Sequence, residues 1–323
     1  MKEFFDLLGW KNIIVAFLAL VLIRISIIIP FYAQWYLPVS ITWEYFLMFT
    51  FGLCFILSGN NIAIKFYDEK LKVCRQDKTN NFNIKQYPDI VRLRGLWVVM
   101  WFTGLVAVVW ASVVTKNYFY YPVCAIVTAL IGYAYANSLR YKFLSGNLAL
   151  GLINALVIFS QLPHDKSALI PVSFRFPVAN AILYQDLVTL FVFLALMVFI
   201  LTIIRDITGD VTNVAQDTKN NYSTLAVKSG ESKSKTVLYA LSLLFIAVTC
   251  VFMYIYSDKL GAIQIVITSA IVILPVIYYM VTLQKAKVQT DYNYLYVFLG
   301  MVFISLLFVI SFCKYLFING NLQ

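Results

Sequence analysis

The run LVTLFVFLALMVFILTII fills residues 187–204 without a charged side chain. It ends at Arg205, where the polar segment RDITGDVTNVAQDTKNNYSTLAVKSG occupies residues 205–230. About 20 apolar residues suffice for a helix to cross the bilayer core, because a helix bonds all its backbone polar groups internally. The stretch therefore predicts a transmembrane helix that carries a polar motif out of the membrane.

Similar apolar runs recur along the whole sequence. Of the 323 residues, 62% are hydrophobic and 12% are charged, a composition too apolar for a soluble domain. We therefore expect an all-α polytopic membrane bundle of about nine transmembrane helices, built as a single membrane-embedded domain over residues 1–323. Hydropathy predicts spans near 12–32, 41–59, 95–115, 118–136, 147–163, 178–204, 236–256, 261–283 and 293–316.

The basic residues are divided unevenly between the two sides of this bundle. Most of the 25 Lys and Arg residues lie at the N-terminus or after the second, fourth, sixth and eighth spans. Because cytoplasmic loops carry the excess of positive charge, we expect a cytoplasmic N-terminus and an external C-terminus, in a bacterial cytoplasmic membrane. The net charge of +10 then reflects topology and attraction to anionic lipids, and no extramembrane basic domain suggests nucleic-acid binding.

Cysteine and histidine chemistry is not indicated. The five cysteines are scattered without a CxxC pair, which argues against a disulfide framework or a zinc site. The single histidine, His164, argues against a His-based metal site or a Ser-His-Asp triad.

Two polar cytoplasmic loops are predicted, at about 60–94 and 205–235. In the second, Asp206, Asp210, Asn213 and Asp217 recur at intervals of four, three and four, which places them on one face of a helix. Carboxylates on one stripe repel one another, and Mg²⁺ would offset that repulsion because it binds through carboxylates and substrate phosphates. The alternative is an ordinary solvated helix end.

Basic residues suited to phosphate accompany this stripe. In the first loop, Asn61, Lys65, Asp68 and Lys72 show the same spacing, with two lysines among them. A diphosphate group is typically bound by cationic side chains that contact its oxygens and by a metal ion that bridges it to a carboxylate. The other candidates for phosphate binding are Arg140, Lys142, Lys219 and Thr224.

At these residues the chain resembles the UbiA superfamily of intramembrane prenyltransferases. The family's second Asp-rich motif, Asp-x-x-Asp-x-x-x-Asp followed by Thr-Leu and Gly, is similar to residues 210–230, with Asn213 in place of the middle acid. The segment SLRYKFLSGNLALG at 138–151 resembles the basic stretch ahead of the fifth helix, and it aligns Arg140 with a diphosphate-binding lysine. The opening segment, residues 10–31, also resembles the family's first helix.

The first family motif, Asn-Asp-x-x-Asp-x-x-x-Asp, is less well preserved. When the motif is aligned on Asp68 as its middle acid, Lys65 and Lys72 take the places of the other two carboxylates. Asn61, three residues before the position of the motif's asparagine, is a possible substitute for it. The exchange of two acids for lysines is expected to weaken or abolish one Mg²⁺ site. The lysines would instead neutralise phosphate directly.

The resemblance implies Mg²⁺-dependent transfer of a polyprenyl group from a prenyl diphosphate to a small acceptor within the membrane. In that reading the catalytic residues are Asp68, Arg140, Asp210 and Asp217. The metal ligands are Asp68, Asp206, Asp210, Asn213 and Asp217. Diphosphate-binding residues are Asn61, Lys65, Lys72, Arg140, Lys142, Lys219 and Thr224. Aromatic acids and glycerol phosphate backbones both serve as acceptors in the family.

Three other functions are compatible with the sequence. A lapsed homologue would bind isoprenoid lipid without chemistry, as the altered first motif suggests. An intramembrane terpene synthase or cyclase would release pyrophosphate without an acceptor. A transporter is disfavoured because its polar site would be expected near the bilayer midplane, whereas the polar residues here gather at one membrane face.

Overall fold

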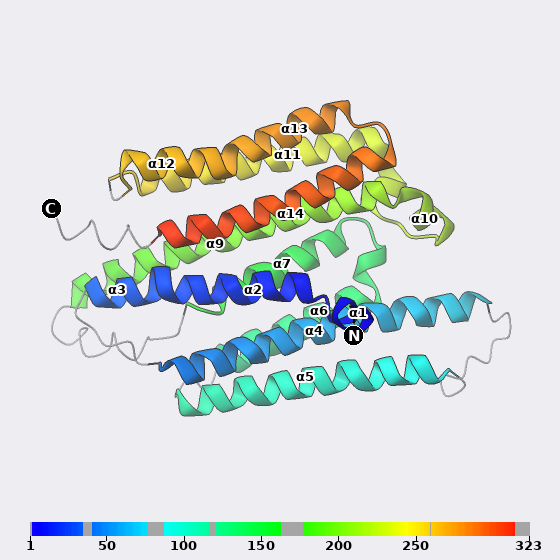
Figure 1. The fold of residues 1–323 in the computed structure, drawn as a ribbon, viewed down its shortest axis with the longest axis horizontal. Coiled ribbons are helices and arrows are strands. Elements are labelled where there is room, and N and C mark those ends of the chain that lie inside the picture. The colour runs from blue at the N-terminus through cyan, green and yellow to red at the C-terminus, as the bar shows by residue number, and fades with distance from the viewer. Residues whose placement is uncertain are drawn as a thin grey trace. The chain divides into compact units, whose positions relative to one another are not determined.

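The computed structural model describes residues 2–34, 41–76, 87–115, 120–162, 177–258 and 260–313, and every regular element in these ranges is helical (Figure 1). The chain divides into two compact units, which are described separately. Unit 1 comprises Met1–Phe17 and Ile41–Arg140, and unit 2 comprises Leu18–Ser40 and Tyr141–Gln323. His164 lies outside the described residues.

Seven helical segments of the described ranges are long and apolar enough to cross a membrane. They are Trp10–Ala33, Trp43–Cys74, Pro88–Val114, Gln185–Thr212, Leu225–Ile255, Ala262–Lys285 and Gln289–Phe312. The prediction of an all-α membrane protein is thereby confirmed, whereas the count of nine spans is not. The expected spans near 118–136 and 147–163 coincide with α6 (Tyr120–Asn137) and α7 (Ser145–Phe159), which are not among the seven. Their described parts are 18 and 15 residues long, which corresponds to about 27 and 22 Å of helix.

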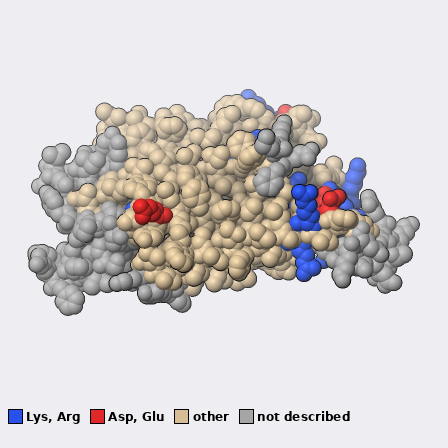
Figure 2. Space-filling model, turned by 60° about the horizontal axis from the view of Figure 1, so that its bottom comes forward, with Lys and Arg blue, Asp and Glu red and all other residues tan. Residues whose placement is uncertain are grey.

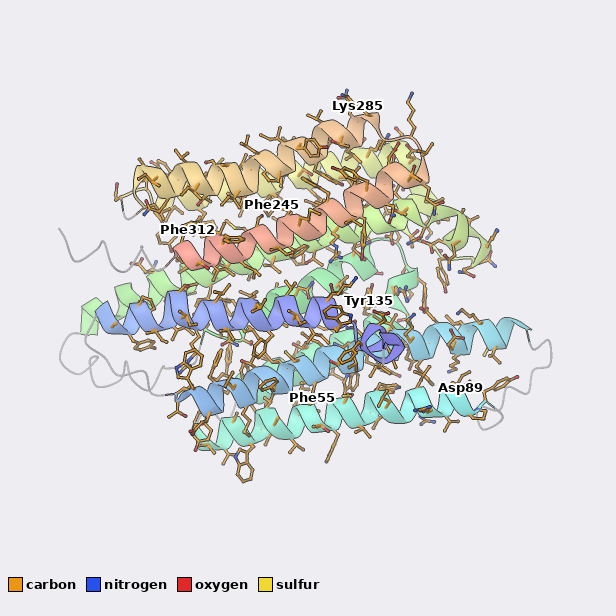
Figure 3. All side chains as sticks on the ribbon, in the orientation of Figure 1. Phe55, Asp89, Tyr135, Phe245, Lys285 and Phe312 are labelled. Carbon is orange, nitrogen blue, oxygen red and sulfur yellow. The ribbon has the colours of Figure 1, made fainter. Side chains whose placement is uncertain are left out.

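The surface of the helices suits contact with lipid. Large apolar side chains such as Phe102 (70% exposed) lie on the outside of the spanning helices. Uncharged side chains cover most of the described surface on the face drawn in Figure 2. Figure 3 shows Phe55 and Phe245 on spanning helices, whereas Asp89 lies at the start of one helix and Lys285 at the end of another. These two charged side chains lie at helix ends, where the membrane would meet water, whereas Arg24 is buried within the span Trp10–Ala33.

Unit 1 is built around α4, which packs against α5 and α6. Its helices are α1 (Lys2–Leu8), α4 (Trp43–Gln76), α5 (Pro88–Val114) and α6. Two glycines allow α4 and α5 to approach closely, because a Cβ at Gly104 would lie 2.6 Å from the carbonyl oxygen of Gly52. Small residues at helix contacts are typical of membrane bundles.

Unit 2 is built around α9 (Pro177–Thr212), which packs against α7, α11 (Leu225–Ile255) and α14 (Gln289–Phe312). Phe191, Phe245 and Tyr279 are fully buried in its apolar core. The Tyr279 hydroxyl lies 2.7 Å from Thr208 Oγ1, which links α9 to α13 (Leu274–Lys285). The remaining helices of this unit are α3 (Ile29–Gln34), α10 (Val214–Lys219), α12 (Ala262–Thr268) and the π-helical segments η1 (Arg24–Ile28) and η4 (Ser269–Ile273). The 3₁₀ turn η3 (Leu139–Tyr141) begins in unit 1 and ends in unit 2. The helix α2 (Trp10–Ile23) begins in unit 1 and ends in unit 2.

Most residues of the two expected polar loops are helical. Residues 60–76 continue α4 and 88–94 begin α5, while 205–212 end α9 and 225–235 begin α11. Polar side chains that recur every three or four residues extend a helix beyond its apolar run. The candidate site residues therefore lie mainly on the ends of helices rather than on loops.

Candidate functional site

The two carboxylates of Asp206 and Asp210 converge in unit 2. They lie one turn apart on α9, and both accept a hydrogen bond from Nδ2 of Asn147 on α7, at 2.9 and 3.0 Å. Asn147 is buried, with 3% of its surface exposed, whereas both aspartates are half-buried. The two acidic side chains are thus held together by hydrogen bonds to one buried amide nitrogen.

The start of α7 positions that amide. Leu144, which precedes the helix, has a left-handed backbone with φ of 50°, a conformation that costs free energy for a residue with a side chain. The turn brings Asn147 into the first turn of α7, opposite the end of α9. Sequence reasoning noted the Gly146–Asn147 pair but gave Asn147 no role. Its signal was an amide in the first turn of an otherwise apolar helix, whose other amide is Asn154.

The predicted four-residue stripe is interrupted at Asn213. The helix α9 ends at Thr212 and α10 begins at Val214, with Asn213 at φ −101° and ψ 9° between them. The expectation of one continuous helix face was therefore wrong beyond Asp210. Asn213 is exposed, and the Asp217 carboxylate instead accepts a long hydrogen bond of 3.5 Å from the hydroxyl of Thr224. An Asn side chain competes with the helical backbone for hydrogen bonds, which makes it a poor residue in a helix interior.

The segment after α10 follows the motif closely. Thr224 is buried immediately before α11, and the backbone N–H of Ser223 donates to the Tyr141 carbonyl at 2.8 Å. Gly230, inside α11, has a φ of 77° and kinks the helix, a conformation that favours glycine. The basic side chains expected to bind phosphate in this unit, Lys142 and Lys219, are both exposed.

In unit 1, two predicted site residues bind each other. Nη1 of Arg140, on the η3 turn that follows α6, lies 3.1 and 2.8 Å from the two carboxylate oxygens of Asp68 on α4. Both side chains are partly buried, with 36% and 26% of their surfaces exposed. The sequence predicted one as a metal ligand and the other as a phosphate ligand, and it did not predict their pairing.

The other predicted residues of α4 have local partners or face outward. The exposed Lys72 ammonium lies 2.7 Å from Glu69, a residue that sequence reasoning did not consider. Lys65 is exposed. Nδ2 of Asn61 donates to the Leu8 carbonyl at 2.9 Å, which satisfies a carbonyl at the end of α1.

Asn60, buried next to Asn61, is another residue that sequence reasoning missed. Its Oδ1 accepts a hydrogen bond from Trp101 Nε1 at 3.0 Å, and no described residue pairs with its Nδ2. The absence of side chains at Gly59 and Gly132 makes room for this contact, since a Cβ on Gly132 would overlap the Asn60 amide. The ring centroids of Tyr133 and Trp101 are 6.2 Å apart, so the Trp101 ring that contacts this amide belongs to an aromatic cluster. Two consecutive asparagines at the end of an apolar span were the available signal.

Unit 1 and unit 2 differ in how well their described carboxylates fit a divalent metal ion. In unit 2, the paired oxygens of Asp206 and Asp210 match the preference of Mg²⁺ for one or two carboxylates together with substrate phosphates. In unit 1, a guanidinium contacts both oxygens of Asp68. Within the described ranges, no group of three or more His, Cys, Asp and Glu side chains could hold a metal by itself. A Mg²⁺ ion held by Asp206 and Asp210 would therefore take its other oxygen ligands from water or from a phosphate.

The described helices define a polytopic α-helical membrane protein, with a pair of carboxylates in unit 2 and an ion pair in unit 1. A structure of digeranylgeranylglyceryl phosphate synthase in membranes matches it with a TM-score of 0.61 and 19% identity, over 98% of this chain and 96% of that chain. An apo UbiA homologue from Aeropyrum pernix K1 matches with a TM-score of 0.57 and 15% identity, over 93% and 96%. A UbiA homologue from Archaeoglobus fulgidus bound to DMAPP and Mg²⁺ matches with a TM-score of 0.56 and 14% identity, over 94% and 98%.

The chain has the fold of the UbiA superfamily, and the resemblance seen in its sequence is confirmed at this level. Neither a protein-family model nor a curated protein matches the sequence. At identities below 20% the likeness is one of fold, so the reaction has to be argued from the site.

Proposed function

We propose that the chain transfers a polyprenyl group from a prenyl diphosphate to a small acceptor within the membrane, with Mg²⁺ as cofactor. The observation that carries this proposal is the convergence of Asp206 and Asp210 on Asn147, in a fold shared with UbiA homologues. Two of the matched structures, from Archaeoglobus fulgidus, hold DMAPP or GPP together with Mg²⁺. That pairing of ligands supports the same chemical class of donor here.

In this proposal Asp206 and Asp210 hold the metal ion and Asn147 orients them. A bound Mg²⁺ ion would neutralise charge on the diphosphate oxygens and so make the diphosphate a better leaving group. Asn213 and Asp217, beyond the helix break, remain candidate ligands on α10. The contact with Thr224 ties Asp217 to the start of α11.

The basic side chains are proposed to bind the diphosphate directly. Arg140, Lys142 and Lys219 are charged donors on the ends of helices or turns, and the exposed Lys65 and Lys72 lie on α4. As the bond between the allylic carbon and the diphosphate oxygen breaks, both electrons leave with the oxygen. These donors then stabilise the growing negative charge. The acceptor nucleophile attacks the allylic carbon and loses a proton to complete the transfer.

The proposal is tested by incubating the purified protein in nanodiscs with a panel of prenyl diphosphates and Mg²⁺. Lipid extracts are analysed for prenylated product, with an aromatic acid or a glycerol phosphate lipid as acceptor. Product that disappears in Asp210→Asn, but persists in the matched control Glu44→Gln at the exposed start of α4, would support transfer. Pyrophosphate release without any acceptor would instead indicate a terpene synthase or cyclase.

A lapsed, lipid-binding homologue is the second candidate, and the ion pair between Asp68 and Arg140 favours it. That pair engages a carboxylate that the resemblance assigns to catalysis. Co-purified isoprenoid lipid, with no turnover of any donor, would support this candidate over the enzyme.

A further inference from the structure

Cationic side chains outnumber the carboxylate on the polar face of α4. Lys65, Asp68 and Lys72 follow one another at intervals of three and four residues, so they share one face of the helix. Both lysines are exposed, and Asp68 is half-buried between them along that face. With Arg140 on Asp68 and Glu69 on Lys72, three cations meet two carboxylates, and this net positive charge favours the binding of an anion over that of a divalent cation.

Asp68 is also engaged by a third cation. Arg140 Nη1 lies within 3.1 Å of both of its carboxylate oxygens. A metal ion at Asp68 would need one of these oxygens, and it would be repelled by the adjacent guanidinium. Because an arginine side chain stays protonated in proteins, the guanidinium of Arg140 would always repel a metal ion at Asp68.

Within α4, Trp43–Gln76, no second carboxylate shares the face of Asp68. Glu69 is its neighbour in sequence, so the two side chains point about 100° apart around the helix. Glu69 itself lies 2.7 Å from the ammonium of Lys72. The Asn61 amide, a further candidate oxygen donor, is turned with its nitrogen toward the Leu8 carbonyl.

We propose that the described part of unit 1 binds diphosphate oxygens through Lys65, Lys72 and Arg140 and supplies no metal ligand. The chain then binds one divalent ion, at Asp206 and Asp210, instead of one ion for each Asp-rich motif. This inference rests on the proposed function, since it takes a diphosphate as the ligand. It changes the role of Asp68 from a metal ligand to a positioning residue that orients Arg140.

The number of bound metal ions tests this directly. Mn²⁺, a paramagnetic substitute for Mg²⁺, is titrated into the full-length protein in nanodiscs with inorganic pyrophosphate present, and bound ions are counted by electron paramagnetic resonance. We expect one Mn²⁺ per chain, which Asp210→Asn weakens at least tenfold and Asp68→Asn leaves in place. Lys65→Ala and Lys72→Ala should keep that single ion while weakening pyrophosphate binding by about tenfold.

The possible failures are distinguishable. Two Mn²⁺ ions per chain, one of them lost in Asp68→Asn, would overturn this inference and leave the proposed function standing. A native protein that binds neither Mn²⁺ nor pyrophosphate would overturn both. If Asp68→Asn lowers thermal stability, the double variant Asp68→Asn/Arg140→Gln removes both charges of the ion pair. It should still bind one Mn²⁺, and loss of that ion from the folded double variant would contradict the inference.

Discussion

At the scale of single residues, the proposed metal site of unit 2 depends on Asn147. Its amide is buried and donates to two carboxylates at once, so it both satisfies buried polar atoms and fixes the distance between two negative charges. A residue that orients metal ligands typically changes metal affinity or activity by about 10- to 100-fold when it is replaced. Asn147 therefore offers a sharper test of the site than an exposed lysine does.

We predict that Asn147→Ala raises the Mg²⁺ concentration needed for half-maximal activity by about tenfold or more. The reason is that Asp206 and Asp210 lose the donor that holds them together. A matched control is Asn154→Ala, which removes another amide from α7, one that donates to Thr202 at 3.1 Å. It should lower stability without changing the Mg²⁺ dependence. Equal Mg²⁺ dependence in the native protein and Asn147→Ala would contradict the assigned role.

At the scale of helices, the polar face of α4 is where unit 1 departs from the first Asp-rich motif that the sequence resembles. The lysines at positions 65 and 72 share a face with Asp68, so carboxylates at those positions would converge with it. Because the Arg140 guanidinium would repel a metal ion at Asp68, the variant Lys65→Asp/Lys72→Asp/Arg140→Gln should gain a second Mn²⁺ site in the presence of pyrophosphate. A titration that still ends at one ion per chain would show that other features of unit 1, besides these three side chains, prevent metal binding.

The close packing of α4 on α5 gives a prediction about stability. A Cβ at Gly104 would lie 2.6 Å from the Gly52 carbonyl oxygen, whereas a Cβ at Gly95 on the same helix would meet nothing within 4 Å. Gly104→Ala should therefore destabilise the protein by about 1 to 3 kcal/mol, because the helices must move apart. Thermal unfolding in detergent, followed by intrinsic fluorescence, would measure the shift. Gly95→Ala is the control and should unfold at or slightly above the native temperature.

At the scale of the whole molecule, the sequence predicted the class of fold through its long apolar runs. It also placed Asp206 and Asp210 on one helix face, because four-residue spacing is a local property. The contact of Asn147 with that face and the pairing of Arg140 with Asp68 join segments distant in sequence, and no local pattern encodes such contacts. The break at Asn213 was missed because a polar stripe does not reveal where the backbone leaves helical geometry.

The distribution of charge predicts the orientation of the chain. We expect a reporter fused at the N-terminus to report the cytoplasm and one fused at the C-terminus to report the outside, since the basic residues concentrate on one side. Green fluorescent protein and alkaline phosphatase fusions at each end would measure this. Both termini on the same side would require an even number of spans and would overturn the predicted topology.

The central claim is that Asp206 and Asp210 support Mg²⁺-dependent cleavage of a prenyl diphosphate. The most direct measurement is pyrophosphate release by the purified protein in nanodiscs with and without Mg²⁺, comparing the native chain with Asp206→Asn/Asp210→Asn. The account predicts release that requires Mg²⁺ and falls at least 100-fold in the double variant. Release that is equal in the double variant, or that proceeds equally well with a chelator present, would contradict it.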